Sequence, residues 1–343
     1  MHGERIEGYH VDAFAAVFEA AAIRPSETVA ILSETGSRSL NVEIAELALA
    51  RLGVRPMRLV APTPPMGKMI VRSTGASRVL HGMGPLVEAM KACDVVVDLT
   101  LEGLMHAPQT PEILSAGTRI QVISDEHPDM LARMLPDPAL KEAVRAGARR
   151  AREAKMMSVT SAAGSDLEVA MAGAQTVGIW GWTDKPGTLA HWPGGIIVSF
   201  PCAGSVSGRL VLQPGDMNLT YKRYVETDVA LTLVEDRITQ ISGNGVDAKL
   251  MRDTLQAWED PDALAVSHVG WGLNPAARWD ALTMMDRADT NGTELRAVAG
   301  NFLFSTGANE FANRFTEGHF DLPMMGCTIS LDGVDVVREG VLQ

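Results

Sequence analysis

Two short segments in the second half of the chain carry residues that could perform chemistry together. Gly318-His319-Phe320-Asp321 places a histidine and an aspartate two positions apart, and Ser267-His268-Val269-Gly270 holds another histidine. In a strand, residues i and i+2 point to the same face, so His319 and Asp321 can offer an imidazole and a carboxylate to one point. A third ligand from a neighbouring strand would complete a two-histidine, one-carboxylate set, which holds non-haem Fe(II) and leaves positions open.

A simpler explanation exists for each histidine taken alone. The sequence around His268 is apolar and glycine-rich, which is typical of a buried core histidine that hydrogen-bonds a carbonyl. The strand of His319 is also expected to be buried. Burying two imidazoles and a carboxylate together costs free energy unless the groups are paired or bind a metal. The metal site is therefore favoured if all three side chains meet.

Two more histidines are candidates for catalysis. His106 lies in the loop-like stretch Leu104 to Pro108, and His191 precedes Trp192-Pro193 in a turn-rich stretch that leads into a strand. A histidine in a loop is commonly just a solvated side chain, but neutral imidazole near pH 7 is also the natural proton acceptor for a phenol-type hydroxyl. Nucleophilic catalysis is disfavoured, because the chain has no GxSxG motif and no evident base near Cys202.

Composition restricts the class of protein. The chain has 343 residues, of which 46% are hydrophobic and 21% charged, enough for one large domain or two domains with a full core. A net charge of -12 argues against nucleic acids or anionic membranes as partners. Three widely separated cysteines without a CxxC motif disfavour a disulfide framework and a thiolate metal site. Without a signal peptide or a membrane-spanning apolar run, we expect a cytoplasmic protein.

The order of elements predicts an α/β protein in two parts. In residues 1–155, strands are expected at 28–32, 57–60, 94–100 and 118–124, and helices at 40–52, 86–92 and up to residue 155. This alternation implies a Rossmann-like parallel sheet covered by helices on both faces, with ligands beyond the carboxyl ends of the strands. His106 follows the third of these strands.

Residues 156–343 are expected to form a β-rich α+β domain that binds the metal. A hairpin is predicted at 156–160 and 166–172, and further strands are predicted at 195–200, 208–212 and within 229–241, where Glu235-Asp236 marks a turn. One helix is predicted at 246–258, after Asn244-Gly245.

The closing segment carries a resemblance to a known family. His319 to Gly326, followed by Ile329 to Val334, resembles the end of the M29 (aminopeptidase T-like) metallopeptidases, which finish with a metal-binding HxD and a short hairpin. The stretch from Trp192 to Gly208 is similar to another of their motifs. The resemblance covers residues 15 to 340, and only the second half carries specific motifs.

The departures from that family indicate a different chemistry. Ile196 stands where those peptidases have one metal-binding glutamate, and His268 where they have another. A two-metal peptidase site needs those carboxylates. The remaining His, His, Asp pattern resembles the branch of the same superfamily formed by 2,5-dihydroxypyridine 5,6-dioxygenases. That resemblance implies that His268, His319 and Asp321 bind Fe(II), while His106 and His191 hold or deprotonate the substrate.

The resemblance implies an Fe(II)-dependent, extradiol-type ring-cleaving dioxygenase of nicotinate catabolism. It would convert 2,5-dihydroxypyridine and O2 to N-formylmaleamate, with His106 as the best candidate for the base and with no other redox cofactor. The expected partners are a small aromatic substrate, O2 and further copies of the chain, with no nucleic acid and no membrane. Two alternatives remain: an M29-like metal-dependent aminopeptidase, and a non-catalytic binding protein that keeps the scaffold.

Overall fold

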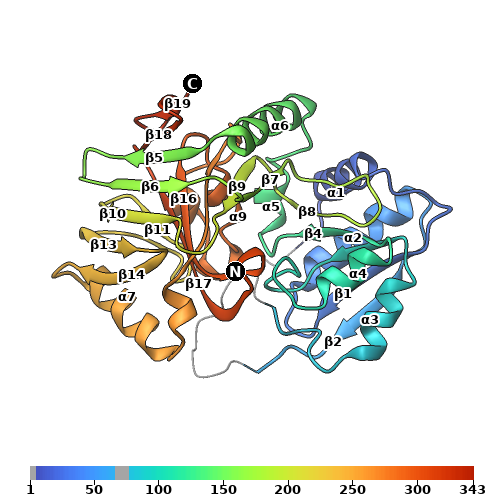
Figure 1. Cartoon of the computed structure of the whole chain (residues 1–343). Helices are drawn as coiled ribbons and strands as arrows, with labels where there is room; N and C mark the ends of the chain where they lie inside the picture. The colour runs from blue at the N-terminus through green and yellow to red at the C-terminus, as the bar shows by residue number, and fades with distance from the viewer. Residues whose placement is uncertain (1–4, 66–76) are drawn as a thin grey trace.

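The computed structural model describes residues 5–65 and 77–343, which form two halves that lie side by side (Figure 1). The first half contains a five-stranded sheet in which all neighbouring strands are parallel. Its strands across the sheet are β2 (Met57–Ala61), β1 (Val29–Glu34), β3 (Val95–Asp98), β4 (Arg119–Ile123) and β8 (Leu189–Trp192). Strands β1, β3 and β4 are buried along their whole length, as expected for a parallel sheet covered on both faces.

Helices cover this sheet on its two faces. Because side chains alternate along a strand, Ile31 of β1 packs in a core with α1 and α2, while the next residue, Leu32, packs in a core with α3 and α4. The helices of this half are α1 (Gly8–Ala20), α2 (Ser39–Arg51), α3 (Gly84–Lys91), α4 (Thr110–Ser115) and α5 (Pro128–Leu131). The expected Rossmann-like architecture is confirmed.

Strand β8 connects the two halves. It comes from beyond residue 155, where the sequence predicts a domain boundary, yet it pairs with β4 and places Val122 opposite His191. Helix α6 (Pro138–Glu153) comes from before residue 155 and packs on strands of the second half through Val144 and Ala148. The division into domains at residue 155 remains a prediction.

The second half consists mainly of two antiparallel sheets. A five-stranded sheet has the order β17 (Arg314–Met324), β16 (Phe302–Asn309), β15 (Val266–Gly272), β9 (Ile196–Phe200) and β7 (Gln175–Ile179). An eight-stranded sheet has the order β14 (Arg237–Ser242), β13 (Val229–Val234), β10 (Val206–Leu212), β6 (Asp166–Ala170), β5 (Met156–Thr160), β18 (Thr328–Leu331), β19 (Val334–Arg338) and β20 (Val341–Leu342). The predicted β-rich second half is confirmed.

The largest hydrophobic core lies between these two sheets and includes residues of helix α7 (Val246–Ala257). Phe320 and Leu322 of β17 and Val269 and Trp271 of β15 belong to this core. Side chains alternate along a strand, so His319, Asp321 and His268 point from the opposite face of the antiparallel five-stranded sheet.

Short elements complete the second half. They are β11 (Met217–Asn218), β12 (Arg223–Tyr224), α8 (Ala281–Met284), α9 (Thr293–Ala297) and the 3-10 turns η1 (Pro261–Leu264), η2 (Arg287–Asp289) and η3 (Glu310–Ala312). The predicted hairpin β5–β6 and helix α7 are present. Glu235 and Asp236 form the predicted turn between β13 and β14, both with positive φ.

Candidate metal centre

His319 and Asp321 meet on one face of β17, as the HxD spacing predicts. The Nε2 atom of His319 lies 3.3 Å from Oδ1 of Asp321. His268 is on β15, two strands away, and its Nε2 lies 3.8 Å from the same oxygen. Small residues on the intervening strand β16 make this approach possible: Gly307 pairs with His319, and Ser305, which pairs with Asp321, donates its hydroxyl hydrogen to Oδ1.

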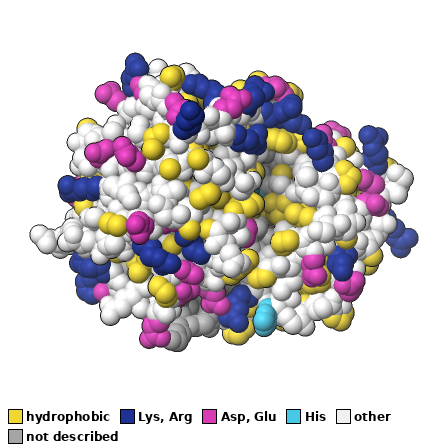
Figure 2. Space-filling model, viewed as in Figure 1, with side chains coloured by type: hydrophobic (Ala, Val, Ile, Leu, Met, Phe, Trp, Pro, Cys, Tyr) yellow, Lys and Arg dark blue, Asp and Glu magenta, His cyan; other side chains and the backbone are white. Residues whose placement is uncertain are grey.

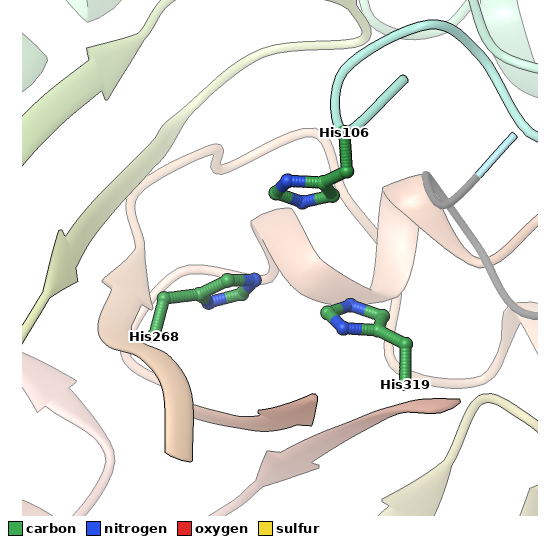
Figure 3. A group of neighbouring side chains, drawn as sticks. All are labelled: His106, His268 and His319. Atoms are coloured by element: carbon green, nitrogen blue, oxygen red, sulfur yellow. The ribbon is translucent and has the colours of Figure 1, made fainter. Parts of the chain in front are cut away.

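His106 reaches the same point from the first half. Its loop follows β3, and the ligand atoms of His106, His268 and His319 all lie within 4.8 Å of one another. Figure 3 shows the three imidazoles converging, one from a loop and two from strands. The structure thus brings together all three predicted metal ligands and one of the two predicted catalytic histidines.

The buried carboxylate of Asp98 shapes the loop that carries His106. It accepts hydrogen bonds from the backbone N–H and the hydroxyl of Thr100, at 2.9 and 2.7 Å, and from the N–H of Leu104, at 2.8 Å. Burial nevertheless raises the pKa of Asp98 to about 6. Gly103 turns the chain with a φ of 70°. His106 therefore follows a turn that one side chain organises.

His191 lines the same pocket from the end of β8. Its Nδ1 lies 3.0 Å from the backbone carbonyl oxygen of Pro193. A carbonyl oxygen only accepts, so Nδ1 carries the hydrogen and Nε2 keeps its lone pair. Burial, followed by the charge of Arg296, lowers the pKa of His191 to about 4, so the ring is neutral near pH 7. His191 can accept a hydrogen bond through Nε2.

The positive charge of Arg296 balances the negative charge of Asp321 beside the histidine cluster. Burial would raise the pKa of Asp321, but the nearby charge of Arg296, followed by the contact with His319, holds that pKa well below its usual range. Burial lowers the pKa of His268 to about 3, despite the neighbouring carboxylate of Asp321. Near pH 7 the site thus holds an ionised carboxylate and a neutral imidazole, the protonation states in which both groups bind metals.

Three residues of the site were missed by the sequence analysis. Arg296 of α9 contacts Asp321, Glu310 of η3 contacts His106, and the ring of Phe200 of β9 packs against His106 and His268. An arginine within the apolar stretch Leu295 to Val298 is a usable signal, because a buried cation needs an anionic partner. We find no such signal for Glu310 or Phe200.

The pocket lies between the two halves. One wall is the face of the antiparallel five-stranded sheet that points away from the large core. Its apolar side chains come from β7, β9 and β16: Ile179, Ile196, Val198, Phe200 and Leu303. The other wall comes from the carboxyl ends of β3, β4 and β8, where the ligands of parallel sheets bind. On the face shown in Figure 2, hydrophobic side chains gather along the junction of the halves.

The pocket also has a polar end. Ser124, Asp125, Asn291 and Thr293 line it together with Arg296. Burial raises the pKa of Asp125 to about 6, against the opposing charge of Arg38. One side of a flat ring could therefore face hydrogen-bonding groups while its faces contact apolar side chains.

Comparisons with known proteins agree with this geometry. The profile of the family described as 2,5-dihydroxypyridine 5,6-dioxygenase matches residues 9–343. The curated 2,5-dihydroxypyridine 5,6-dioxygenase of Pseudomonas putida (strain KT2440) is 35% identical over 333 residues, which is 95% of this chain and 94% of that protein. The chain belongs to the 2,5-dihydroxypyridine 5,6-dioxygenase family.

Solved structures place the family in a wider fold group. The 2,5-dihydroxypyridine dioxygenase from Pseudomonas putida KT2440 superposes with a TM-score of 0.91 at 34% identity, covering 97% of this chain and 96% of that one. Wild-type AmpT from Thermus thermophilus superposes with a TM-score of 0.63 at 14% identity, covering 97% and 98%. The second likeness shows a shared fold alone, and it matches the fold expected from the M29 resemblance.

Membership of this dioxygenase family implies a metal cofactor, and the residues present fit one. The Nε2 atoms of His268 and His319 both face Oδ1 of Asp321, and two imidazole nitrogens with one carboxylate oxygen are a donor set that binds a transition metal. The three histidines form a group of potential metal ligands, and Oδ1 of Asp321 lies beside two of them. Ile196 lines the pocket, and thus no carboxylate enters at that position.

No helix among the described residues is long and apolar enough to cross a membrane.

Proposed function

We propose that this protein is an Fe(II)-dependent dioxygenase that opens the ring of 2,5-dihydroxypyridine between C5 and C6 and yields N-formylmaleamate. The ligands are His268, His319 and Asp321. The observation that carries the proposal is the convergence of these three side chains at the floor of a pocket that also holds His106 and His191.

The ligand set is supported by the balance of charge and by geometry. Two imidazoles and one carboxylate form the arrangement that binds non-haem Fe(II) on one face. A second triple, His106, His268 and His319, shares two of these ligands. We favour Asp321 over His106 because a carboxylate supplies a charge that an imidazole lacks, and because Asp321 and both strand histidines come from one sheet whereas His106 comes from a loop of the other half. When bound, ferrous iron supplies the open positions and the redox path by which O2 reacts with an electron-rich ring.

The protein's own groups then bind the ring and move its proton. His106 accepts the proton of a ring hydroxyl, which makes the ring a better electron donor. His191 accepts a hydrogen bond from an O–H or N–H of the substrate through Nε2. Phe200, Leu303 and Val198 provide apolar contacts to a flat ring and exclude water. Both atoms of O2 enter the product, so the ring supplies all the electrons and no other reductant is needed.

The test uses metal-free protein loaded with Fe(II) under anaerobic conditions. After 2,5-dihydroxypyridine and O2 are added, one O2 should be consumed for each ring that is lost. The loss of the ring is measured by the decrease in its absorbance. With labelled O2, two heavy oxygen atoms should appear in N-formylmaleamate. No O2 uptake, or one labelled oxygen per product, would contradict the proposal.

The rival peptidase is tested in the same preparation. An M29-like aminopeptidase would release amino acids from dipeptides with Zn(II), Co(II) or Mn(II) at two sites per chain. We expect no release and one metal per chain. A homo-oligomer and a cytoplasmic location remain predictions of the sequence; gel filtration with light scattering would determine the number of chains.

A further inference from the structure

The buried imidazole of His106 contacts a carboxylate from the other half of the chain. Its Nδ1 lies 3.1 Å from both Oε1 and Oε2 of Glu310, which is 204 residues away in the sequence. The His106 side chain is 4% exposed and that of Glu310 is 29% exposed. Burial acts to raise the pKa of Glu310, but the hydrogen bond with His106 opposes it and the pKa is lowered. The contact is thus between an imidazole and an ionised carboxylate.

This contact determines which nitrogen of His106 carries the hydrogen. An ionised carboxylate only accepts hydrogen bonds, so Nδ1 donates, and in the neutral form of the ring the lone pair is then on Nε2. The ring's other neighbours include Phe200 and His319, whose ring centroids lie 6.2 and 5.7 Å away. Such ring contacts restrict the plane of the imidazole but do not select between its two tautomers.

The turn that carries Glu310 is itself held in place. Glu310 begins η3, which connects β16 to β17, and the side chain of Asn309 accepts a hydrogen bond from Ala312 N at 3.1 Å. The Asn309 side-chain amide also donates to the carbonyl oxygen of Pro201, at 3.1 Å. Phe311 packs on Phe200 with ring centroids 5.1 Å apart. These contacts fix the carboxylate at the edge of the pocket.

We propose that Glu310 is the positioning residue for His106. It holds the imidazole across the junction of the two halves and keeps the hydrogen on Nδ1, so that Nε2 is the atom available to a substrate hydroxyl. Glu310 touches neither the substrate nor the metal in this scheme and acts only through His106. The inference rests on the proposed function insofar as His106 receives a proton from the substrate.

The test compares Glu310→Gln with Glu310→Asp and with a matched control. The glutamine has the same shape, but its NH2 group can donate to Nδ1 and so stabilise the other tautomer. We expect kcat to fall about 10- to 100-fold, by analogy with the loss when the hydrogen-bonding partner of a metal-ligating histidine is removed. KM and the iron content per chain should stay within about twofold of wild type, and the melting temperature should stay within a few degrees. Glu310→Asp, which keeps the charge, should recover part of kcat.

Glu317→Gln is the control. Glu317 is on the same strand pair and forms a 2.7 Å ion pair with Arg78, but its side chain is 59% exposed. Its replacement should leave kcat unchanged. Equal effects of the two glutamine variants, an unchanged kcat in Glu310→Gln, or loss of iron from Glu310→Gln would each overturn the proposal.

A spectroscopic measurement separates this inference from the proposed function. In metal-free protein with 15N-labelled histidine, the His106 ring, assigned by comparison with His106→Gln, should show a protonated Nδ1 and an unprotonated Nε2. In Glu310→Gln these signals should shift toward the opposite tautomer. If wild type fails to cleave 2,5-dihydroxypyridine, the proposed function fails, and these signals still decide the role of Glu310. Identical His106 signals in both proteins would refute it.

Discussion

Two nitrogens of the Arg296 guanidinium contact the same carboxylate oxygen of Asp321. Both Nε and Nη2 of the guanidinium lie 2.6 Å from Oδ2 of the aspartate, and both side chains are buried. The arginine therefore occupies Oδ2 and leaves Oδ1 facing His268 and His319. In the proposed site, Asp321 binds the metal through one oxygen, and the Arg296 cation remains beside it whether or not metal is bound.

Replacing this arginine should destabilise the metal-free protein selectively. Arg296→Met keeps much of the side-chain volume but leaves a buried carboxylate without its cation, which costs about 3–5 kcal/mol of unfolding free energy. Fe(II) would compensate that charge, so anaerobic metal should restore most of the loss. Urea unfolding with and without Fe(II) measures both. Arg278→Met, which removes an exposed ion pair with Asp280, is the control and should change stability little. Equal losses in both variants, or no recovery with metal, would contradict this.

The pH dependence of stability should report His191. Its pKa is lowered to about 4 in the folded protein, whereas an unfolded imidazole titrates near 6.5. Between pH 6.5 and 4 the unfolded chain binds a proton that the folded protein does not, so this group makes stability fall as the pH drops through that window. Its contribution approaches about 1.4 kcal/mol per pH unit.

The measurement is a comparison of wild type with His191→Gln, both metal-free. Asp98 and Asp125 have raised pKa values and titrate in the opposite sense over part of this range, so the difference between the two proteins isolates His191. The variant should lose less stability than wild type between pH 6.5 and 4. Parallel stability curves would show that His191 is not buried in its neutral form.

The loop held by Asp98 should matter for catalysis more than for metal binding. Asp98→Ala leaves the N–H groups of Thr100 and Leu104 without their acceptor and releases the turn before His106. Misplacing a reacting group by about 1 Å can cost about 100-fold in rate, and we expect a loss of kcat of that order with iron per chain unchanged. Asp94→Ala is the control, since Asp94 precedes the same strand at its other end and accepts from Thr28 N. A variant Asp98→Ala with normal kcat would contradict the assignment.

The sequence could predict the parts of this site that depend on local periodicity. The two-residue spacing of His319 and Asp321 places both on one face of β17 wherever that strand lies, and the βα alternation places His106 after a strand end. His268 is a candidate ligand by residue type, but its own surroundings fit a core histidine equally well, so the family resemblance is needed to decide between the two interpretations.

The remaining residues depend on pairing between distant segments. Glu310 meets His106 only because β16 and β17 form a hairpin whose turn faces the loop after β3. Arg296 lies on a five-residue helix whose position is set by tertiary contacts. Likewise, β8 joins the first sheet through a parallel pairing with β4, which local sequence pattern does not encode. Long-range register cannot be inferred from one sequence by periodicity.

The central claim is that His268, His319 and Asp321 hold one Fe(II), with His106 reserved for the substrate. The most direct test is to load wild type, His106→Ala and Asp321→Asn with Fe(II) anaerobically, remove free metal and measure iron per chain. We expect one iron per chain in wild type and His106→Ala, and little or none in Asp321→Asn. Iron lost from His106→Ala but retained by Asp321→Asn would establish the three-histidine set and rule out Asp321 as a ligand.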